Sequence, residues 1–300
     1  MITVVGSINL DLIANVDRLP APGETLRSSG FTTAPGGKGA NQALAAARAG
    51  GEVRMLGAVG RDGFATEALA CLRQGGVQLS SVREAAAATG IALIFVDGKG
   101  ENVIVIAPGA NDTVLPGDLA RAAFRQGEVV LLQLEIPLAT VEATLAAVAQ
   151  TGGVSVLNTA PFRAEAAKLL PMADFVVANE TEFDLYADTL KLEGGDRKTR
   201  MADFTKRTGR TVIVTLGADG VIAASPEGEL AVPALAITPV DTVGAGDTFC
   251  GYLGAGLADG LSLEHALRRA AAAGSLACLS PGAQPAIPHA KEVDEALAGA

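Results

Sequence analysis

The sequence predicts an α/β fold, a three-layer, Rossmann-like and mostly parallel sheet that is flanked by helices and carries a small β-sheet lid. Short apolar runs without polar alternation recur along the chain, as they do in strands that are covered on both faces. Alanine-rich and leucine-rich stretches with helical spacing separate these runs and supply the crossovers of a parallel sheet. The predicted strands are 2–5, 53–59, 129–134, 154–157, 175–177 and 211–216, and the predicted helices are 41–49, 65–74, 138–150, 249–258 and 263–277.

Two segments do not follow this alternation of strands and helices, and they predict the lid. Residues 12–34, with Pro20, Pro22 and Gly23, and residues 89–108, around the turn Asp97–Gly100, read as paired strands without helices between them. A flap inserted at two separate places is not an independently folding module, so we expect one domain over residues 1–300. The flap is suited to close over a ligand or to pair with a second copy in a homodimer.

Composition excludes several classes of function. The net charge of −10 argues against nucleic acid and anionic membrane as partners, because both require a basic surface. Cys71, Cys250 and Cys278 lack Cys-x-x-Cys spacing, which argues against a disulfide framework and a zinc site and favours the reducing cytoplasm. No stretch reaches roughly 18 uncharged apolar residues, so no membrane anchor is predicted.

The segment Asp241–Phe249 carries the strongest chemical signal. Gly244 and Gly246 lie at the start of a predicted helix, where unpaired backbone N–H groups and the absence of side chains suit a bound phosphate. Asp247 cannot neutralise a phosphate, so beside one it is suited to accept the proton of an attacking hydroxyl. The alternative is an ordinary tight loop with a capping aspartate.

A second glycine-rich turn, Gly36–Gln42, also precedes a helix. It is not a phosphate-binding P-loop, because Gly39 follows Lys38 where Ser or Thr would bind Mg²⁺. The backbone of Gly37 can approach a neutral polyol, and Asn41 offers a donor and an acceptor to its hydroxyls, so a sugar is the favoured ligand. The alternative is a helix-start loop that Asn41 caps locally.

Other polar residues follow predicted strands, where ligands of open α/β sheets bind. Asn9 and Asp11 come after the first strand, and alternate positions on an extended chain point the same way, although Asn and Asp there are more often turn formers. Glu135 ends an apolar strand, where an unpaired carboxylate is costly unless it faces a cleft.

Two further loops suit a nucleotide. Asn179 and Glu182 open a helix after an apolar strand and are suited to phosphate oxygens and to water-bound Mg²⁺, although the same spacing describes a capping box. The glycine-bearing loop Thr215–Gly220 is suited to nucleotide phosphates or adenine, and a plain hairpin has the same pattern.

In order, these segments resemble the signatures of the ribokinase-like carbohydrate kinase family over nearly the whole chain. Residues 92–104 leading to Gly109–Asn111, together with Gln133–Glu135 and Gly282–Pro285, resemble the ribokinase branch of the family more than fructokinases or adenosine kinases. The resemblance implies a central sheet flanked by helices, a β-sheet lid that also forms a dimer contact, and transfer of the γ-phosphate of ATP to the 5-hydroxyl of D-ribose, with Mg²⁺ and an activating K⁺.

The resemblance also implies roles for individual residues, with Asp247 as the base. The positions that match the family's pentose contacts are Asn9, Asp11, Gly37, Lys38, Asn41, Glu135 and Asp247. The anion hole matches Gly244, Ala245 and Gly246. Nucleotide and Mg²⁺ contacts match Asn179, Glu182, Thr215, Gly217, Ala218, Gly220 and Gly246. The monovalent-cation site matches Asp241, Val243, Ala277, Ser280, Gly282 and Ala286.

The chain departs from the family pattern at two of these places. Ala286 replaces a serine hydroxyl near the cation, and Ala271 replaces Asn or His beside adenine, which puts cation affinity and nucleotide preference in doubt. The competing functions are another sugar or nucleoside kinase on the same fold and a non-catalytic sugar-binding sensor. Retention of Asp247 together with both neighbouring glycines argues against the sensor, because a binder needs no base.

Overall fold

A nine-stranded sheet forms the centre of the molecule, and the computed structural model describes residues 1–98 and 102–299 of the chain. The strand order is β13-β12-β11-β10-β9-β8-β1-β4-β5, parallel from β11 to β5, with β12 and β13 antiparallel at one edge. The strands are β1 Ile2–Val5, β4 Val53–Gly60, β5 Gln78–Ala85, β8 Val129–Leu132, β9 Val154–Asn158, β10 Phe175–Asn179, β11 Thr211–Thr215, β12 Val221–Ser225 and β13 Gly228–Val232.

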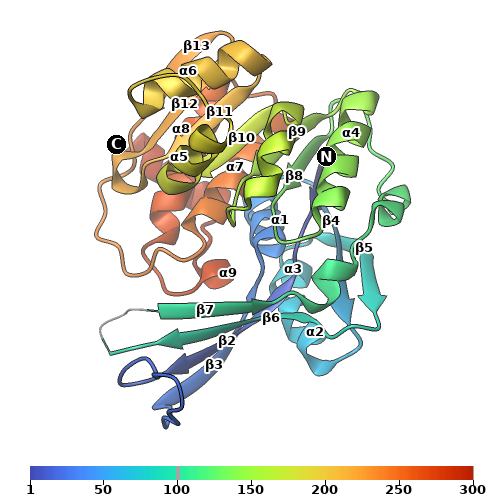
Figure 1. Cartoon of the computed structure of the whole chain (residues 1–300), viewed down its shortest axis with the longest axis vertical. Coiled ribbons are helices and arrows are strands. Elements are labelled where there is room, and N and C mark those ends of the chain that lie inside the picture. The colour runs from blue at the N-terminus through green and yellow to red at the C-terminus, as the bar shows by residue number, and fades with distance from the viewer. Residues whose placement is uncertain (99–101, 300) are drawn as a thin grey trace.

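Helices cover both faces of this sheet, so the predicted three-layer α/β fold is confirmed (Figure 1). Val4 packs into a core with α1, α7 and α8, whereas its neighbour Val5 packs into a second core with α4, α5 and α6. Successive residues of a strand point to opposite faces, so a strand covered on both sides must be apolar throughout. The helices are α1 Lys38–Arg48, α2 Gly63–Ala68, α3 Ala70–Gln74, α4 Leu138–Thr151, α5 Glu180–Thr189, α6 Arg197–Thr208, α7 Ala245–Ala258, α8 Leu263–Ala277, α9 Ala283–Ala286 and α10 Ala290–Ala298, with 3-10 turns η1 Gly109–Thr113, η2 Pro116–Arg121, η3 Ala164–Met172 and η4 Gly217–Asp219.

A separate four-stranded sheet projects from the main body at the bottom of Figure 1. Its order is β3-β2-β6-β7, from β2 Asn9–Asn15, β3 Gly30–Gly36, β6 Gly90–Val96 and β7 Asn102–Ala107. The strands come from the two segments predicted as a lid, but pairing begins earlier, at Asn9, and ends later, at Gly36. Of the predicted turn between β6 and β7, Lys99 and Gly100 lie outside the described residues.

The structure corrects four local predictions. The helix predicted at 65–74 is two short helices that meet at Leu69, and the helix predicted at 41–49 begins at Lys38 because Gly37 serves as its N-cap. Strand β8 ends at Leu132, so Glu135 lies beyond the strand and not at its last residue. Asn9 and Asp11 are strand residues of β2 and do not form a turn after β1.

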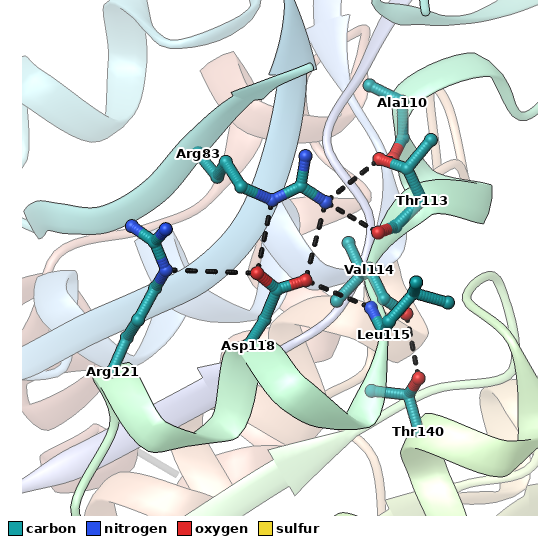
Figure 2. Close-up of polar contacts among 8 residues, drawn as sticks. All are labelled: Arg83, Ala110, Thr113, Val114, Leu115, Asp118, Arg121 and Thr140. Carbon is teal, nitrogen blue, oxygen red and sulfur yellow. Dashed lines mark hydrogen bonds and ion pairs between the residues drawn. The ribbon is translucent and has the colours of Figure 1, made fainter. Parts of the chain in front are cut away.

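A partly buried ion pair fixes the chain between the two sheets. Arg83 on β5 donates to both carboxylate oxygens of Asp118, at 3.1 and 3.3 Å, and also contacts Thr113 at the end of η1 (Figure 2). Asp118 in turn accepts a hydrogen bond from the backbone N–H of Leu115 at 3.0 Å. These contacts anchor η1, which carries Asn111 toward the start of the small sheet.

Across residues 1–98 and 102–299, no helix combines the length and the apolar character that crossing a bilayer requires.

Candidate active site

The first turn of α7 places Asp247 in the interior at the edge of a cleft. Gly244 is the N-cap of this helix with φ 78°, and a Cβ there would lie 2.8 Å from the Cβ of Ala283, so the position requires glycine. The Asp247 side chain is 7% exposed, and its carboxylate accepts hydrogen bonds from Asn41 Nδ2 at 2.9 Å and Gln42 Nε2 at 3.0 Å. Asn41 therefore does not cap its own helix, and that alternative is wrong.

The start of α1 brings a positive charge to the same place. Gly37 has φ 88°, and a Cβ there would lie 2.7 Å from the backbone nitrogen of Asn9, so the turn approaches β2 closely. The next residue, Lys38, donates its backbone N–H to Glu135 Oε2 at 3.1 Å. Nearby Asp247, Glu135 and Glu182 raise the pKa of the Lys38 ammonium against the opposing effect of its burial, so the group stays charged.

Asp11 and Asn9 face this cluster from the small sheet. Burial, followed by the charges of Glu135 and Asp247, raises the pKa of Asp11 to about 7, while Lys38 acts in the opposite direction. The side-chain oxygen of Asn9 accepts a hydrogen bond from Asn111 Nδ2 at 2.7 Å. That contact uses the side-chain oxygen of Asn9 and not its amide hydrogens, and it links β2 to η1.

Two cavities meet beside Asp247. The first, of about 220 Å³, is polar and is lined by residues that include Lys38, Asn179, Glu182 and Asp247. The second, of about 380 Å³, is more apolar and runs between the β11–β12 loop and helices α7 and α8. Both cavities are lined by Thr215, Thr242 and Gly246, so an elongated ligand with a polar and an apolar end can extend through both.

The lining residues fit a nucleotide with its metal. A Cβ on Gly246 would meet no atom within 4 Å, which means that the first turn of α7 borders open space where its N–H groups can receive an anion. Glu182 and Asn179 supply oxygen atoms, the ligands that Mg²⁺ prefers. Gly217, Ala218, Gly220 and Ala271 form part of the wall of the apolar cavity, where small side chains leave room for a flat ring.

Two of these loops also form the ordinary structures that their sequences allow, a capping box and a hairpin. Asn179 caps α5 by accepting a hydrogen bond from the Glu182 backbone N–H at 2.8 Å, and Glu182 Oε2 accepts one from the Asn179 backbone N–H at 3.1 Å. The capping box and the cavity wall are therefore made by the same two residues. Likewise Thr215–Gly220 joins the antiparallel strands β11 and β12 as a hairpin while lining the apolar cavity.

Hydrogen bonds bring together some of the residues that are predicted to surround a monovalent cation. Asp241 accepts from the backbone N–H of Val243 at 3.0 Å and of Gly282 at 2.8 Å, which ties the loop before α7 to the turn after α8. Ala277 is the last residue of α8, and Ser280 lies in the turn that follows it. Ala286 is the last residue of α9, the short helix that begins directly after Gly282.

Comparisons with known proteins assign this architecture to a family. The model of the pfkB family carbohydrate kinases matches residues 1–290, nearly the whole chain. The chain belongs to the pfkB family. A ribokinase from Lactococcus lactis is 37% identical to this pfkB-family chain over 300 residues, covering 99% of the chain and 96% of the relative. A deoxyribokinase from Salmonella typhi is 33% identical over 305 residues, covering 99% and 98%.

Solved structures of the pfkB fold agree with this membership. The crystal structure of a ribokinase from Thermotoga maritima has a TM-score of 0.91 at 30% identity, covering 99% of both chains. The structure of Arabidopsis thaliana ribokinase complexed with ribose and ATP has a TM-score of 0.87 at 32% identity, covering 99% of this chain and 98% of the other.

Reasoning from sequence missed several buried polar residues of this pfkB-family site. Ser7 donates to Glu135 Oε2 at 2.6 Å and accepts from the Gly39 N–H at 3.2 Å, which joins β1 to α1. Other missed residues are buried amides that contact Asn9, Asn41 or Asp247 directly or, in the case of Gln133, through Gln42. They are Gln42, Asn111, Gln133 and Gln284.

Proposed function

We propose that the chain transfers the γ-phosphate of Mg-ATP to the 5-hydroxyl of D-ribose, giving ribose 5-phosphate. The observation that carries the proposal is the position of Asp247, a buried carboxylate in the first turn of α7 where the two cavities meet. The ribokinase relatives, and the ribose and ATP with which the Arabidopsis ribokinase is complexed, support the choice of sugar and nucleotide.

In this mechanism the pentose lies among the polar groups that converge on Asp247. The predicted contacts Asn9 and Asp11 reach it from β2, and Lys38 and Asn41 reach it from α1. Asp247 accepts the proton of the 5-hydroxyl as that oxygen attacks the γ-phosphorus, the bond from this phosphorus to the bridging oxygen breaks, and ADP leaves. Because the acceptor is held in line, and closure of the small sheet excludes water, the sugar is phosphorylated in preference to water.

The anion hole is the N-terminus of α7. The backbone N–H groups of Gly244, Ala245 and Gly246 are suited to bind the oxygens of the moving phosphoryl group, and preorganised donors of this kind usually supply the largest stabilisation. Asn179 and Glu182 would hold Mg²⁺ through its water shell, and the bound ion would neutralise charge on the phosphates. Gly217, Ala218 and Gly220 form the wall beside the adenosine.

The first test is a ribose-dependent ADP-release assay with and without K⁺. We propose that Asp241, Val243, Ala277, Ser280, Gly282 and Ala286 surround K⁺, largely through backbone carbonyls. We expect turnover to rise when K⁺ replaces a bulky organic cation at constant ionic strength. The same rate in both salts would contradict the cation site, and no ADP release in either would contradict the kinase.

A second candidate acceptor is favoured by one of the relatives. The 33% identical deoxyribokinase makes 2-deoxyribose a direct competitor of ribose. A panel of ribose, deoxyribose, fructose, 2-keto-3-deoxygluconate and adenosine distinguishes the kinases, and ribose is expected to have the highest kcat/KM. Binding of ribose without ADP release would favour the sugar-binding sensor.

The affinity for ribose is expected to depend on pH through Asp11, whose pKa is about 7. The ionised carboxylate accepts bonds from sugar hydroxyls, so ribose favours the deprotonated form. Below pH 7 the competent fraction falls, and KM for ribose should rise about tenfold per pH unit, whereas above about pH 8 it should be constant. KM measured from about pH 5.5 to 8.5 tests this, and in Asp11→Asn the KM, although higher, should no longer change across that range.

We also propose a homodimer through the small sheet. The strand register puts Phe31, Leu93, Val103 and Val105 on the sheet face opposite Asp11, and their side chains are 63%, 37%, 45% and 52% exposed. An exposed apolar face next to an edge strand is a typical contact surface.

The double variant Leu93→Asp/Val105→Asp is therefore expected to sediment as a monomer when the parent chain sediments as a dimer. Val240, 67% exposed in the loop before α7, provides the control, and Val240→Asp should leave the dimer intact. A monomeric parent chain at micromolar concentration would overturn the proposal. A cytoplasmic location is proposed from the three unpaired cysteines and from the ATP that the reaction consumes.

A further inference from the structure

We propose that Gln42, Gln133 and Gln284 are positioning residues that hold the Asp247 carboxylate through two converging chains of side-chain amides. The inference rests on the proposed function, because it holds that these residues fix the orientation of the catalytic base. None of the three was predicted from sequence, and all are buried, with 1%, 0% and 0% of their surface exposed.

Each carboxylate oxygen of Asp247 ends one chain. In the first chain Gln133 Nε2 donates to Gln42 Oε1 at 2.6 Å, and Gln42 Nε2 donates to Asp247 Oδ1 at 3.0 Å. In the second, Gln284 Nε2 donates to Asn41 Oδ1 at 3.1 Å, and Asn41 Nδ2 donates to Asp247 Oδ2 at 2.9 Å. Every link is a hydrogen bond between buried side chains.

The ionised carboxylate sets the direction of both chains. A carboxylate only accepts hydrogen bonds, so Gln42 and Asn41 must turn their NH₂ groups toward Asp247. Their oxygens then face outward and require a donor, which Gln133 and Gln284 supply. In consequence the outer oxygens, Gln133 Oε1 and Gln284 Oε1, have no hydrogen-bond partner within the described part of the chain.

Those two unpaired oxygens argue for function and against mere stability. A buried acceptor without a donor carries the desolvation penalty of the polar atom, and a well-packed apolar side chain of the same shape avoids it. Gln133 and Gln284 are thus unfavourable residues for the fold alone. Their benefit lies at the other end of each chain, where the two oxygens of the base are held by amides that cannot titrate.

The chains join elements that are distant in sequence. Gln42 lies on α1, Gln133 follows β8 and Gln284 lies on α9, while Asp247 is on α7. Asn41, the other direct donor, also lies on α1, so one helix holds both carboxylate oxygens, and each donor is itself held by an amide from another element. Rotation of the Asp247 side chain therefore breaks these hydrogen bonds. Misplacement of a base by about 1 Å can reduce the rate about 100-fold.

The test replaces one outer glutamine with methionine, which has nearly the same shape. Gln133→Met removes the donor to Gln42 and one unpaired oxygen while leaving Gln42 Oε1 unpaired, so the number of unpaired acceptors does not change. We expect the Tm to stay within a few degrees of wild type while kcat falls about tenfold or more and KM for the sugar barely changes. Wild-type kcat would overturn the proposal.

The two chains make different kinetic predictions. Gln133 acts only through Gln42, so the double variant Gln42→Met/Gln133→Met should be about as slow as Gln42→Met alone. Gln284 acts through Asn41, a proposed sugar contact, so Gln284→Met should raise KM as well as lower kcat. Losses that multiply within the first chain, or a Gln284→Met with unchanged kcat and KM, would contradict the assignment even if one single variant failed to fold.

Two controls separate the possible failures. Thr144 is fully buried in α4 and bonds to the Thr140 carbonyl at 2.7 Å, so Thr144→Val loses a buried hydrogen bond far from the site and should keep wild-type kcat. All variants are assayed with the acceptor that the wild-type chain phosphorylates fastest. If Asp247→Asn is inactive but Gln133→Met is fully active and folded, the positioning role fails and Asp247 remains the base, whereas a fully active Asp247→Asn removes both the positioning role and the role of Asp247 as base.

Discussion

Replacing Asp247 with asparagine is expected to lower kcat by about 10³-fold or more, because the variant keeps the shape of the side chain but loses the group that accepts the proton. The α7 turn should fold as before, since Asn still offers one acceptor to the amides of Asn41 and Gln42. ADP release with ribose and ATP measures the rate, and the Tm with and without ADP measures folding and nucleotide binding.

The matched control lies on the same helix. Asp259 is the exposed C-cap of α7, and Asp259→Asn should retain the wild-type rate. Asp247→Asn with a rate near wild type would remove the residue from the chemistry. Loss of ADP binding together with activity would show that the substitution disturbs the nucleotide site and not only the base.

Gly246→Leu is expected to abolish nucleotide binding without unfolding the protein. The Cβ position of Gly246 faces open space at the junction of the two cavities, so a leucine there occupies the space of the phosphates and clashes with nothing within 4 Å at its Cβ. Leucine also favours a helix over glycine by about 0.5–1 kcal/mol. We therefore expect at least about a 100-fold weaker affinity for ADP, together with an equal or higher Tm.

Gly63 provides a matched substitution for this experiment. It is the first residue of α2, and a Cβ there also meets nothing within 4 Å. Gly63→Leu should show a similar change in Tm and unchanged ADP affinity by calorimetry. Normal ADP affinity in Gly246→Leu would mean that the phosphates do not lie against the first turn of α7, and the proposed anion hole would be wrong.

The parallel strands were the predictable part of the fold. β1 and β8, in which all four residues are buried and nearly all are apolar, carry the signal of strands covered on both faces. β5 was missed because it lies at the sheet edge, where most of its residues are partly or fully exposed and the apolar run disappears. The break at Leu69 was missed because residues on both sides of it have ordinary helical character.

The site was predictable where glycines and carboxylates mark it. Gly244 and Asp247 form a local pattern whose chemistry can be argued without coordinates, and the structure places Asp247 beside the cleft. The buried amides carry no such pattern, because Gln133 and Gln284 have identifiable partners only once the chain is folded. Asp11 was predicted as a site residue, but its raised pKa was not, because the shift comes from burial and from charges far away in sequence.

The close packing of α1 against α7 has a consequence for biosynthesis. A Cβ on Gly251 would lie 2.4 Å from the Cβ of Ala45, so the two helices approach closely enough for Asn41 and Gln42 to reach Asp247. Because Asp247 lies on α7 and its two amide partners lie on α1, the carboxylate joins the pocket only after α7 has been synthesised. Nascent or truncated chains that stop before α7 lack Asp247, and they are expected to transfer no phosphate from ATP.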